Sequence, residues 1–328
     1  MGGLAAIRTA AVAVALSMLA GCASGQAHAG VANPLAGITF FVDANNPAAQ
    51  QAAEWHAQGR SAEAEAIQRI ASQPTATWFT GGEAVEAEVR SLTQRAALAH
   101  ESALLVAYDI PGRDCSGYSA GGAGSAAEYR AWIDRFAAGL GERPATVILE
   151  PDAIAQTLSR CLSAGAVRER YALLGYAIAR LKAHRHVTVY LDAGNVGFVR
   201  PAARLAGPLR RSGIAHADGF ALNVSNFYGT TATVAYGQAL SRVLGGVHFV
   251  IDTGRNGNGP DLNPADSPDW CNPPGRALGP PPTTSTGRPL VDAYLWIKQP
   301  GFSDGSCRPG EPRAGAWWPQ YALALARG

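Results

Sequence analysis

Charged side chains are scarce in this chain: they make up 16% of its 328 residues, and the formal net charge is only +2. No cluster of Lys and Arg stands out along the sequence, so the basic surface that nucleic-acid binding requires is missing. A hydrophobic content of 47% is too high for a disordered protein, and the abundance of Gly (38) and Pro (21) is atypical of a helical bundle. We expect a loop-rich globular protein with neutral partners and no nucleic acid among them.

The common sequence signals for bound metals and phosphates are also absent. The chain contains no CxxC pair, no HExxH and no GK[ST] ending of a phosphate-binding loop. We therefore predict neither a metal site nor a cofactor.

The N-terminus has the pattern of an export signal. A single cation, Arg8, precedes the apolar run 9–19, which is too short to span a membrane as a stable helix. The sequence LAGC at 19–22 is similar to the bacterial lipobox, in which cleavage precedes the Cys and the Cys takes up lipid. An ordinary secretory signal, with Cys22 incidental, is the alternative. We predict a lipoprotein-type signal over residues 1–21, lipidation of Cys22, and export to the outer face of the cell membrane or into the medium.

Besides Cys22, the chain has an even number of cysteines. An even number in an oxidising compartment indicates disulfides, and these residues allow three pairings. The local pairing closes two loops and stabilises by about 4 kcal/mol each in the chain-entropy model. A metal site is the other use of such a set. We predict disulfides between Cys115 and Cys161 and between Cys271 and Cys307.

The rest of the chain divides into a tether and a body. Residues 22–36 are small and polar, with Pro and Gly, which is typical of a flexible tether. In the body, 37–328, short apolar runs alternate with helix-patterned segments at 47–72, 83–99, 126–140, 153–183 and 231–244. The eight runs are ITFFVD, TWFT, ALLVAYD, TVILEPD, VTVYLD, GFALNVS, HFVIDT and AYLWIK.

Such alternation indicates a mostly parallel sheet that is covered on both faces. Eight candidate strands suit a barrel, so we predict a distorted single-domain β/α barrel with its helices outside; an open doubly wound sheet is the alternative. Two segments rich in Gly, Pro, Asn and Ser, 112–125 and 253–290, interrupt the alternation, and each contains a cysteine. We expect them to be ordered surface loops that shape a site.

Carboxylates follow the ends of most candidate strands. The carboxyl ends of parallel strands converge on one face, so these side chains are expected to meet there. Helix capping is the alternative for single residues such as Asp152 and Asp192. Crowded carboxylates suit acid–base chemistry on an acetal, because burial and like charges keep one group protonated while another stays ionised. The polar residues at this edge are Asp109, Asp114, Glu150, Asp152, Asp192, Asn223, Ser225, Asp252, Lys298 and Asp304.

Aromatic residues near the same loops offer flat faces for sugar rings. Trp270 lies in a polar loop, where packing explains an indole poorly, whereas Trp78 fits the core and a cleft equally well. Tyr108, Tyr118 and Phe198 are further candidates.

The segment 117–121 also fits the G-x-S-x-G pattern of serine esterases, and Asp192 with His216 or His248 follows in the expected order. That motif requires its Ser directly between a strand and a helix. A long loop with a cysteine precedes Ser119 here, so the sequence argues against an esterase.

Two long stretches carry a family resemblance. VAYDIPGRDCSGYSAGG (106–122) and VILEPDAIA (147–155) resemble the signatures of glycoside hydrolase family 6, the cellulases that include endoglucanases and cellobiohydrolases. The similarity continues in order along the chain through TWF (77–79), YLDAG (190–194), LNVSN (222–226), IDTGRNGNGP (251–260), DWCNP (269–273) and DAYLWIKQPGFSDGSC (292–307).

The resemblance implies hydrolysis of β-1,4-glucan with inversion at the anomeric carbon. It implies that Asp152 is the general acid and that Asp114 raises the pKa of this acid and helps organise the water. Asp192 matches a further carboxylate of the cleft. Asp304 matches the proposed base, although a chain of waters can carry the proton in this family. The predicted sugar-contacting residues are Trp78, Tyr108, Asn195, Phe198, Asn223, Trp270, Lys298 and Phe302.

Three of these positions depart from the family pattern. Asn195 stands where His is usual, Phe198 where a stacking Trp is common, and Phe302 where Glu is usual. We expect weaker or redirected glucan binding from these changes. They also motivate an alternative, a non-catalytic or weakly active surface carbohydrate-binding protein on the same fold. Retention of the four aspartates argues against it, because binding alone does not need crowded carboxylates.

The short interval between Cys271 and Cys307 predicts an open cleft, because family members that act on chain ends roof the cleft with long loops. The sequence therefore favours an endoglucanase that cleaves internal bonds of soluble or amorphous glucan. We expect a monomer whose partner is the polysaccharide, with membrane contact only through the lipidated N-terminus.

Overall fold

The computed structural model describes residues 1–3, 32–262 and 269–328. Contacts divide the chain into Met1–Ala32 and Asn33–Gly328, and the second unit is the folded body. All but the first three residues of the predicted signal, together with Cys22 and the larger part of the predicted tether, lie outside the described residues. In the part of the chain that is described, no helix has the length and apolar character that crossing a membrane requires.

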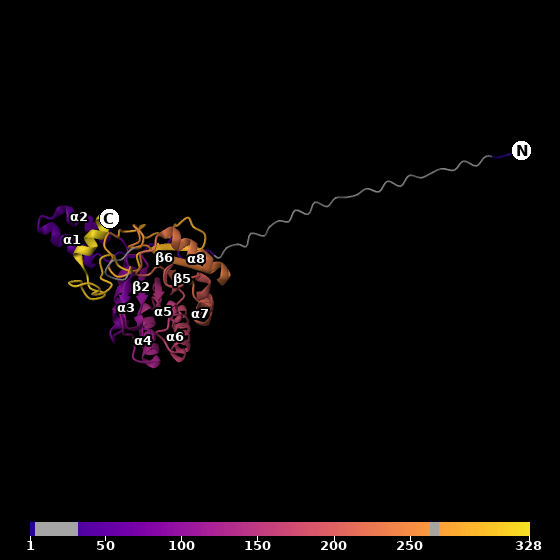
Figure 1. Cartoon of the computed structure of the whole chain (residues 1–328), viewed down its shortest axis with the longest axis horizontal. Helices are drawn as coiled ribbons and strands as arrows, with labels where there is room; N and C mark the ends of the chain where they lie inside the picture. The colour runs from indigo at the N-terminus through magenta and orange to yellow at the C-terminus, as the bar shows by residue number, and fades with distance from the viewer. Residues whose placement is uncertain (4–31, 263–268) are drawn as a thin grey trace. The chain divides into compact units, whose positions relative to one another are not determined.

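Strands and helices alternate along the body (Figure 1). The helices of the described residues are α1 (Pro47–Ala57), α2 (Ser61–Ala71), α3 (Val85–Leu98), α4 (Ala126–Leu140), α5 (Ala153–Gln156), α6 (Ala164–Lys182), α7 (Ala206–Arg211), α8 (Thr230–Leu244) and α9 (Pro319–Arg327). The strands are β1 (Thr77–Phe79), β2 (Ala103–Ala107), β3 (Ala145–Leu149), β4 (Val187–Asp192), β5 (Gly219–Leu222), β6 (His248–Asp252) and β7 (Val291–Leu295).

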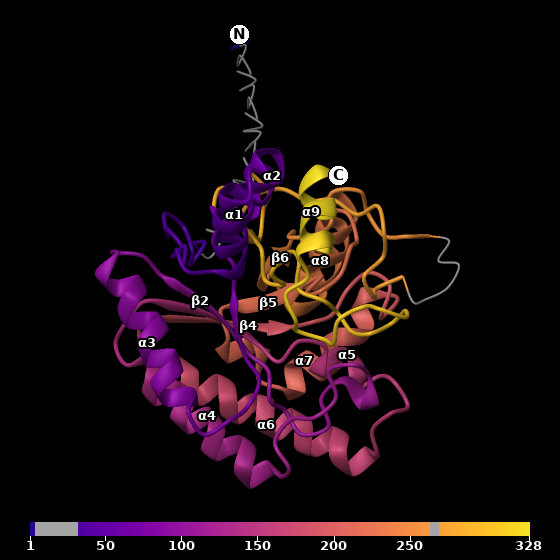
Figure 2. The same cartoon turned by 90° about the vertical axis from the view of Figure 1, so that its left-hand side faces the viewer.

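The described strands form one parallel sheet of seven strands in the order β1-β2-β3-β4-β5-β6-β7. Because the strands follow one another in chain order, the reversal of a doubly wound sheet is missing and that alternative is excluded. The sheet curls into a half-barrel with helices around it (Figure 2), which confirms the predicted fold class. An isolated parallel bridge joins Thr75, just before β1, to Trp296, just after β7. The Trp78 indole N–H donates to the Ile297 carbonyl at 2.8 Å.

One predicted strand was wrong. Within ITFFVD, Phe40 forms a single parallel bridge with Ser102, just before β2 begins, and the segment forms no strand. The pairing stops there because β1 occupies the same edge of β2 from Leu105 onward. The apolar character of this segment serves burial instead, since Phe40 lies in the core.

The expected tether was too long at its C-terminal end. The Asn33 side chain donates to the Asp292 carbonyl at 2.9 Å, and Leu35 is fully buried among residues of the sheet. Residues 33–36 are therefore part of the body.

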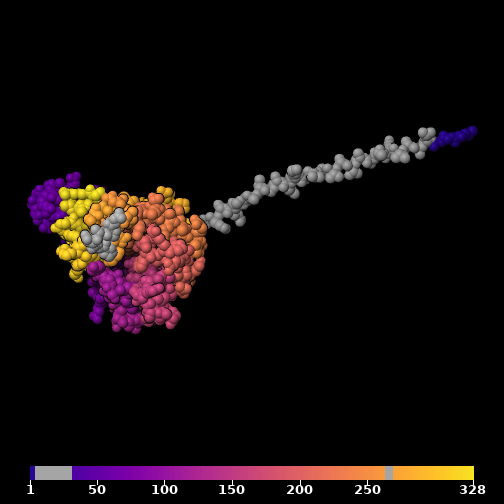
Figure 3. All heavy atoms as spheres, viewed as in Figure 1, coloured from indigo at the N-terminus to yellow at the C-terminus, as the bar shows by residue number. Residues whose placement is uncertain are grey.

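The strands are mostly apolar because both faces of the sheet are covered. Alternate residues of β2 show this: Leu105 packs toward the surrounding helices, and Val106 packs into the interior of the half-barrel. Figure 2 shows α3, α4 and α6 side by side along one face. A separate cluster joins α1 and α2 to α9 around the buried Trp296, and Figure 3 shows these helices together at one end of the body.

Both predicted disulfides are confirmed. Cys115 bonds to Cys161 and Cys271 to Cys307, with Cα atoms 5.8 and 6.3 Å apart. Each bond ties one of the two predicted long loops to a second segment, so these loops are ordered where the structure describes them.

Candidate active site

The carboxyl ends of the strands bring the predicted carboxylates to one edge of the sheet. Asp152 follows β3, and Asp192 and Asp252 end β4 and β6. Asp114 lies in the loop after β2, and Asp304 lies in the loop after β7. The site is therefore built from loops far apart in the sequence, as the parallel topology requires.

Asp152 has a left-handed backbone, with φ at 65°, at the start of α5. Its backbone N–H donates to Asp192 Oδ1 at 2.8 Å, which brings the two acidic residues into direct contact. Its side chain makes no capping hydrogen bond to α5, so the carboxyl group remains available for chemistry. Burial, and then the charge of Asp114, raise the pKa of Asp152 to about 7. This residue is thus a carboxylic acid that still holds its proton close to neutral pH.

Asp192 is fully buried beside it. Its Oδ1 accepts hydrogen bonds from the backbone N–H groups of Asp152 and Gly194, whereas Oδ2 has no partner among the described residues. Burial and the neighbouring Asp152 raise the pKa of Asp192 well above its usual value. Ionising both residues is costly, because nearby like charges repel strongly where water is excluded.

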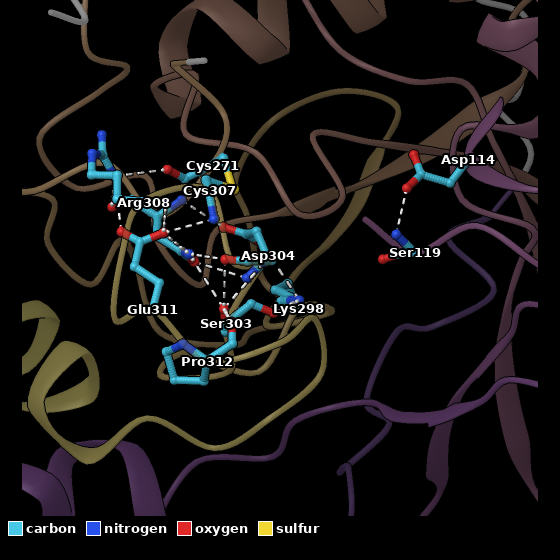
Figure 4. Close-up of a disulfide and its surroundings, with 12 residues drawn as sticks. Asp114, Ser119, Cys271, Lys298, Ser303, Asp304, Cys307, Arg308, Glu311 and Pro312 are labelled. Carbon is cyan, nitrogen blue, oxygen red and sulfur yellow. Dashed lines mark hydrogen bonds and ion pairs between the residues drawn. A yellow bond between two sulfur atoms is a disulfide. The ribbon is translucent and has the colours of Figure 1, made fainter. Parts of the chain in front are cut away.

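Asp114 faces this pair from the loop after β2. Its φ is 57°, and its Oδ2 accepts the Ser119 N–H at 2.6 Å (Figure 4). Burial raises its pKa, and the Ser119 hydrogen bond and Arg113 oppose that rise. Gly117 passes so close that a Cβ there would lie 2.5 Å from Asp114 Oδ2. Ser119 therefore serves this loop through its backbone, in a segment that is not the strand–turn–helix of an esterase.

The surroundings of Asp304 favour its ionised form, in contrast to those of Asp152 and Asp192. Its Oδ2 accepts from Arg255 Nη1 at 2.7 Å, and Lys298 Nζ lies 3.4 Å from Oδ1. Figure 4 shows Lys298 and the Cys271–Cys307 loop around it. Burial disfavours its charge, but the two cations outweigh burial and lower the pKa of Asp304. Sequence reasoning missed Arg255; the signal for it was an arginine among glycines directly after a strand.

The loops that carry Asp114 and Asp304 touch each other. Tyr118 packs so closely on Gly305 that a Cβ there would lie 2.4 Å from the tyrosine ring. The rings of Tyr118 and Trp270 are 6.1 Å apart, and the two side chains are 49% and 37% exposed. This contact places exposed aromatic faces between the two loops, as stacking on sugar rings requires.

Trp78 and Lys298 also lie where a sugar contact was predicted. Trp78 is half-buried at the end of the sheet, and Lys298 Nζ lies 5.8 Å from the centre of its ring. Phe198 is 43% exposed in the loop after β4. Phe302 is half-buried, and its ring packs edge-on against Trp317 at 5.5 Å.

Three predicted sugar contacts are buried, and their side chains hold the site together. Tyr108 packs edge-on against Trp78, with Arg113 over its ring. Asn195 Oδ1 accepts from the N–H groups of the turn that follows it, at Gly197 and Phe198. The Asn223 amide donates to the carbonyls of Tyr228 and Asp252. Position in the sequence does not distinguish a free side chain from one held by hydrogen bonds, because both kinds follow strand ends.

Two of the predicted rim carboxylates have the same anchoring role. Asp252 accepts from the backbone N–H groups of Ser225, Gly254, Ile297 and Lys298. Glu150 is fully buried and accepts from the N–H groups of Asp109 and Ile110. These carboxylates fix the ends of neighbouring strands relative to one another.

Among the described residues, Cys271, Cys307 and Glu311 are close enough to hold a metal ion. The two cysteines are bonded to each other, so they offer no thiolates.

Residues 35–328 match the family model of the glycosyl hydrolases family 6. The chain is 42% identical over 294 residues to endoglucanase A of Cellulomonas fimi, a match that covers 88% of this chain and 61% of that protein. It is 38% identical over 332 residues to endoglucanase 1 of Streptomyces halstedii, with 98% of each chain covered. The structure of the endoglucanase Cel6 from Mycobacterium tuberculosis, in complex with methyl-cellobiosyl-4-deoxy-4-thio-β-D-cellobioside, superposes with a TM-score of 0.83 at 44% identity, covering 90% of this chain and 99% of that one. The chain belongs to the glycosyl hydrolases family 6, the family that its two signatures resemble.

Proposed function

We propose that this protein is an endoglucanase that hydrolyses internal β-1,4-glucosidic bonds of cellulose-like β-glucans with inversion. The observation that carries the proposal is the contrast between two carboxyl groups of one site. Asp152 keeps its proton to about pH 7, whereas Arg255 and Lys298 hold Asp304 in the ionised form. Glycoside hydrolysis needs this division between an acid and a base.

In the proposed reaction Asp152 donates its proton to the leaving glycosidic oxygen while a water attacks the anomeric carbon from the opposite face. Asp304 accepts the proton of that water, directly or through further waters. Inversion requires about 6.5–9.5 Å between the two carboxyl groups, which leaves room for the water. Trp78, Trp270 and Tyr118 supply rings on which sugars stack.

Internal cleavage is supported by the exposed aromatic residues along the loops and by the relatives, of which several are named endoglucanases at 38–44% identity. The short interval of 36 residues between Cys271 and Cys307 also supports an open cleft.

The test is the product analysis of barley β-glucan and cellohexaose. We expect the α-anomer to appear first by NMR, and a mixture of oligosaccharides of several lengths. The β-anomer as the first product would contradict inversion, and release of cellobiose alone from chain ends would contradict internal cleavage.

A second candidate function is carbohydrate binding without turnover. It is favoured by Asn195, Phe198 and Phe302, which depart from the family pattern at predicted sugar contacts. Loss of viscosity of carboxymethylcellulose separates the two functions. We expect the viscosity to fall; unchanged viscosity with preserved affinity for cello-oligosaccharides would favour the binding protein.

We also propose that the chain is exported, that Cys22 is lipidated and that the mature protein acts as a monomer. The apolar run before LAGC supports export, and disulfides in the body suit an oxidising compartment. Expression in a bacterium fed labelled fatty acid is expected to label the protein, and Cys22→Ala is expected to abolish the label. Equal labelling of both proteins would contradict lipidation at this residue.

A further inference from the structure

A buried arginine with no part in the chemistry above connects the two segments that carry Asp114 and Asp152. Arg170 of α6 is 2% exposed. Its Nη2 donates to the carbonyls of Pro111 and Gly112, at 2.9 Å each, just before Asp114. Its Nη1 donates to Gln156 Oε1 at 2.8 Å and to the Ala153 carbonyl at 3.4 Å, within the helix that follows Asp152.

We propose that Arg170 is a positioning residue that fixes the separation of Asp114 from Asp152 and thereby sets the pH range of the acid. The proposal rests on the function proposed above, because it concerns the same acid.

The cost of burying a guanidinium supports this role. A buried cation destabilises a protein unless it is paired and hydrogen-bonded, and an apolar residue of similar size serves packing alone equally well. Arg170 instead donates to two carbonyls of the Asp114 segment, those of Pro111 and Gly112. A second buried side chain binds the same segment. The buried Glu150 accepts from the N–H groups of Asp109 and Ile110, so the same segment is held through its amides and through its carbonyls.

The Cys115–Cys161 disulfide joins nearly the same segments but at a different depth. Cys161 is exposed and lies beyond the end of α5, whereas Arg170 contacts α5 itself from the interior. The disulfide therefore limits how far the loop that carries Asp114 can move, and Arg170 sets the position of that loop at the site.

The separation of Asp114 from Asp152 matters because the pKa of Asp152 depends on the charges near it. The titratable groups that face it are Asp114 from the loop after β2, Asp192 from β4 and the hydroxyl of Tyr108 at the end of β2. If the Asp114 segment moves away, its charge opposes ionisation of Asp152 less, so Asp152 loses its proton at lower pH. A misplacement of about 1 Å at a reacting group also costs roughly 100-fold in rate.

The experiment compares Arg170→Met with Arg143→Met in the full-length protein. Arg143 is the control because its half-buried guanidinium also donates to protein oxygens, Thr93 Oγ1 and the Gly139 carbonyl, but at the opposite end of β3. For Arg170→Met we expect kcat on soluble glucan to fall roughly 10- to 100-fold with KM changed less than about threefold. The alkaline limb of its kcat–pH profile moves to lower pH. Arg143→Met keeps the wild-type profile.

If Arg170→Met does not fold, as judged by circular dichroism, Arg170→Lys replaces it. Lysine keeps the charge but cannot reach both segments at once, so a smaller shift in the same direction is expected. An unshifted alkaline limb in a folded variant overturns the inference, whatever happens to kcat. If the unaltered protein hydrolyses no glucan, the proposed function fails and this inference fails with it; an active wild type with an unshifted variant removes the inference alone.

Discussion

Asp152, Asp192 and Asp304 carry the same chemical group and differ only in their surroundings. Burial and carboxylate neighbours favour the protonated form of the first two, whereas Arg255 and Lys298 favour the ionised form of the third. Because the intrinsic pKa is the same for all three, the chemistry assigned to each aspartate follows from its burial and from the charges near it.

The first prediction at this scale concerns proton donation. Asp152→Asn removes the acid, which typically contributes about 10²–10⁴-fold, so hydrolysis of natural glucan falls by that factor. An aryl cellobioside with a good phenolate leaving group needs little protonation and stays a substrate. The measurement is kcat/KM on both. Asp43→Asn is the control, because Asp43 pairs with Arg95 at the surface. Equal losses on the two substrates would contradict the assignment.

A second prediction for Asp152→Asn concerns the pH dependence of stability. The pKa of Asp152 is raised to about 7, so the folded protein binds this proton more tightly than the unfolded chain does. The stabilisation is complete below about pH 4 and is lost as the pH rises through about 7. Asp152→Asn stays uncharged, so we expect its stability relative to wild type to increase by about 3 kcal/mol between pH 4.5 and pH 8. Denaturant unfolding at both pH values measures this, and equal differences would count against it.

Phe302 offers a prediction about glucan binding. Its ring packs against Trp317, where the family usually has Glu. Phe302→Glu restores a hydrogen-bonding group, so we expect KM on soluble glucan to fall severalfold, at a cost in stability from the lost ring contact. Phe302→Leu is the control, since it loses the ring without adding an acceptor. If Phe302→Glu leaves KM and turnover unchanged, this position does not contribute to glucan binding.

At the scale of the elements, close packing of helices on the sheet depends on single glycines. Gly237 of α8 faces β6 so closely that a Cβ would lie 2.3 Å from the Phe249 ring. Gly175 of α6 meets only the Ser212 carbonyl, at 3.7 Å. Alanine raises helix propensity by about 1 kcal/mol at either position, but overpacking costs about 1–3 kcal/mol.

We therefore predict that Gly237→Ala lowers the free energy of unfolding by up to about 2 kcal/mol, whereas Gly175→Ala leaves it unchanged or raises it. Denaturant unfolding of both variants tests this. A stabilised Gly237→Ala would show that α8 can move away from the sheet at little cost.

Helices and strands were predictable where the hydrophobic pattern of a segment and the length of that segment indicate the same element. Continuous apolar runs located the strands from β1 to β7, and the segment 126–140 coincides with α4. The segment 153–183 forms α5 and α6 instead of one helix, because Ser163 caps a new helix by accepting the Ala166 N–H. ITFFVD has the composition of a strand, but whether a strand forms depends on a free neighbouring edge, which sequence alone does not reveal.

At the scale of the whole molecule, the disulfides join segments that the sheet already brings together. Each constrains the unfolded chain over 46 or 36 residues, which corresponds to about 4 kcal/mol apiece in the chain-entropy model. We expect a reductant to lower the Tm of the wild type. We expect a smaller fall in two double variants that each lack one disulfide, Cys115→Ser with Cys161→Ser and Cys271→Ser with Cys307→Ser.

A variant that lacks all four cysteines serves as the control, because its Tm has no disulfide to lose. An equal fall in Tm in that variant would show that the reductant acts elsewhere. No fall in the wild type would contradict a stabilising role for the bonds.

The sequence by itself determined the family, the parallel alternation of strands and helices and the strand ends at which the carboxylates lie, because these follow from local pattern and chain order. It favoured a barrel over an open sheet and one of three cysteine pairings, and the structure confirmed both choices. Only the tertiary structure decided which polar side chains are free and which are anchored. The side chains of Asn223 and Asp252 form hydrogen bonds within the protein. Arg255 pairs with Asp304, and Arg170 donates to the Pro111 carbonyl in the segment before Asp114. Protonation and availability depend on burial and on charges brought together by folding, and neighbours in space are not neighbours in the chain.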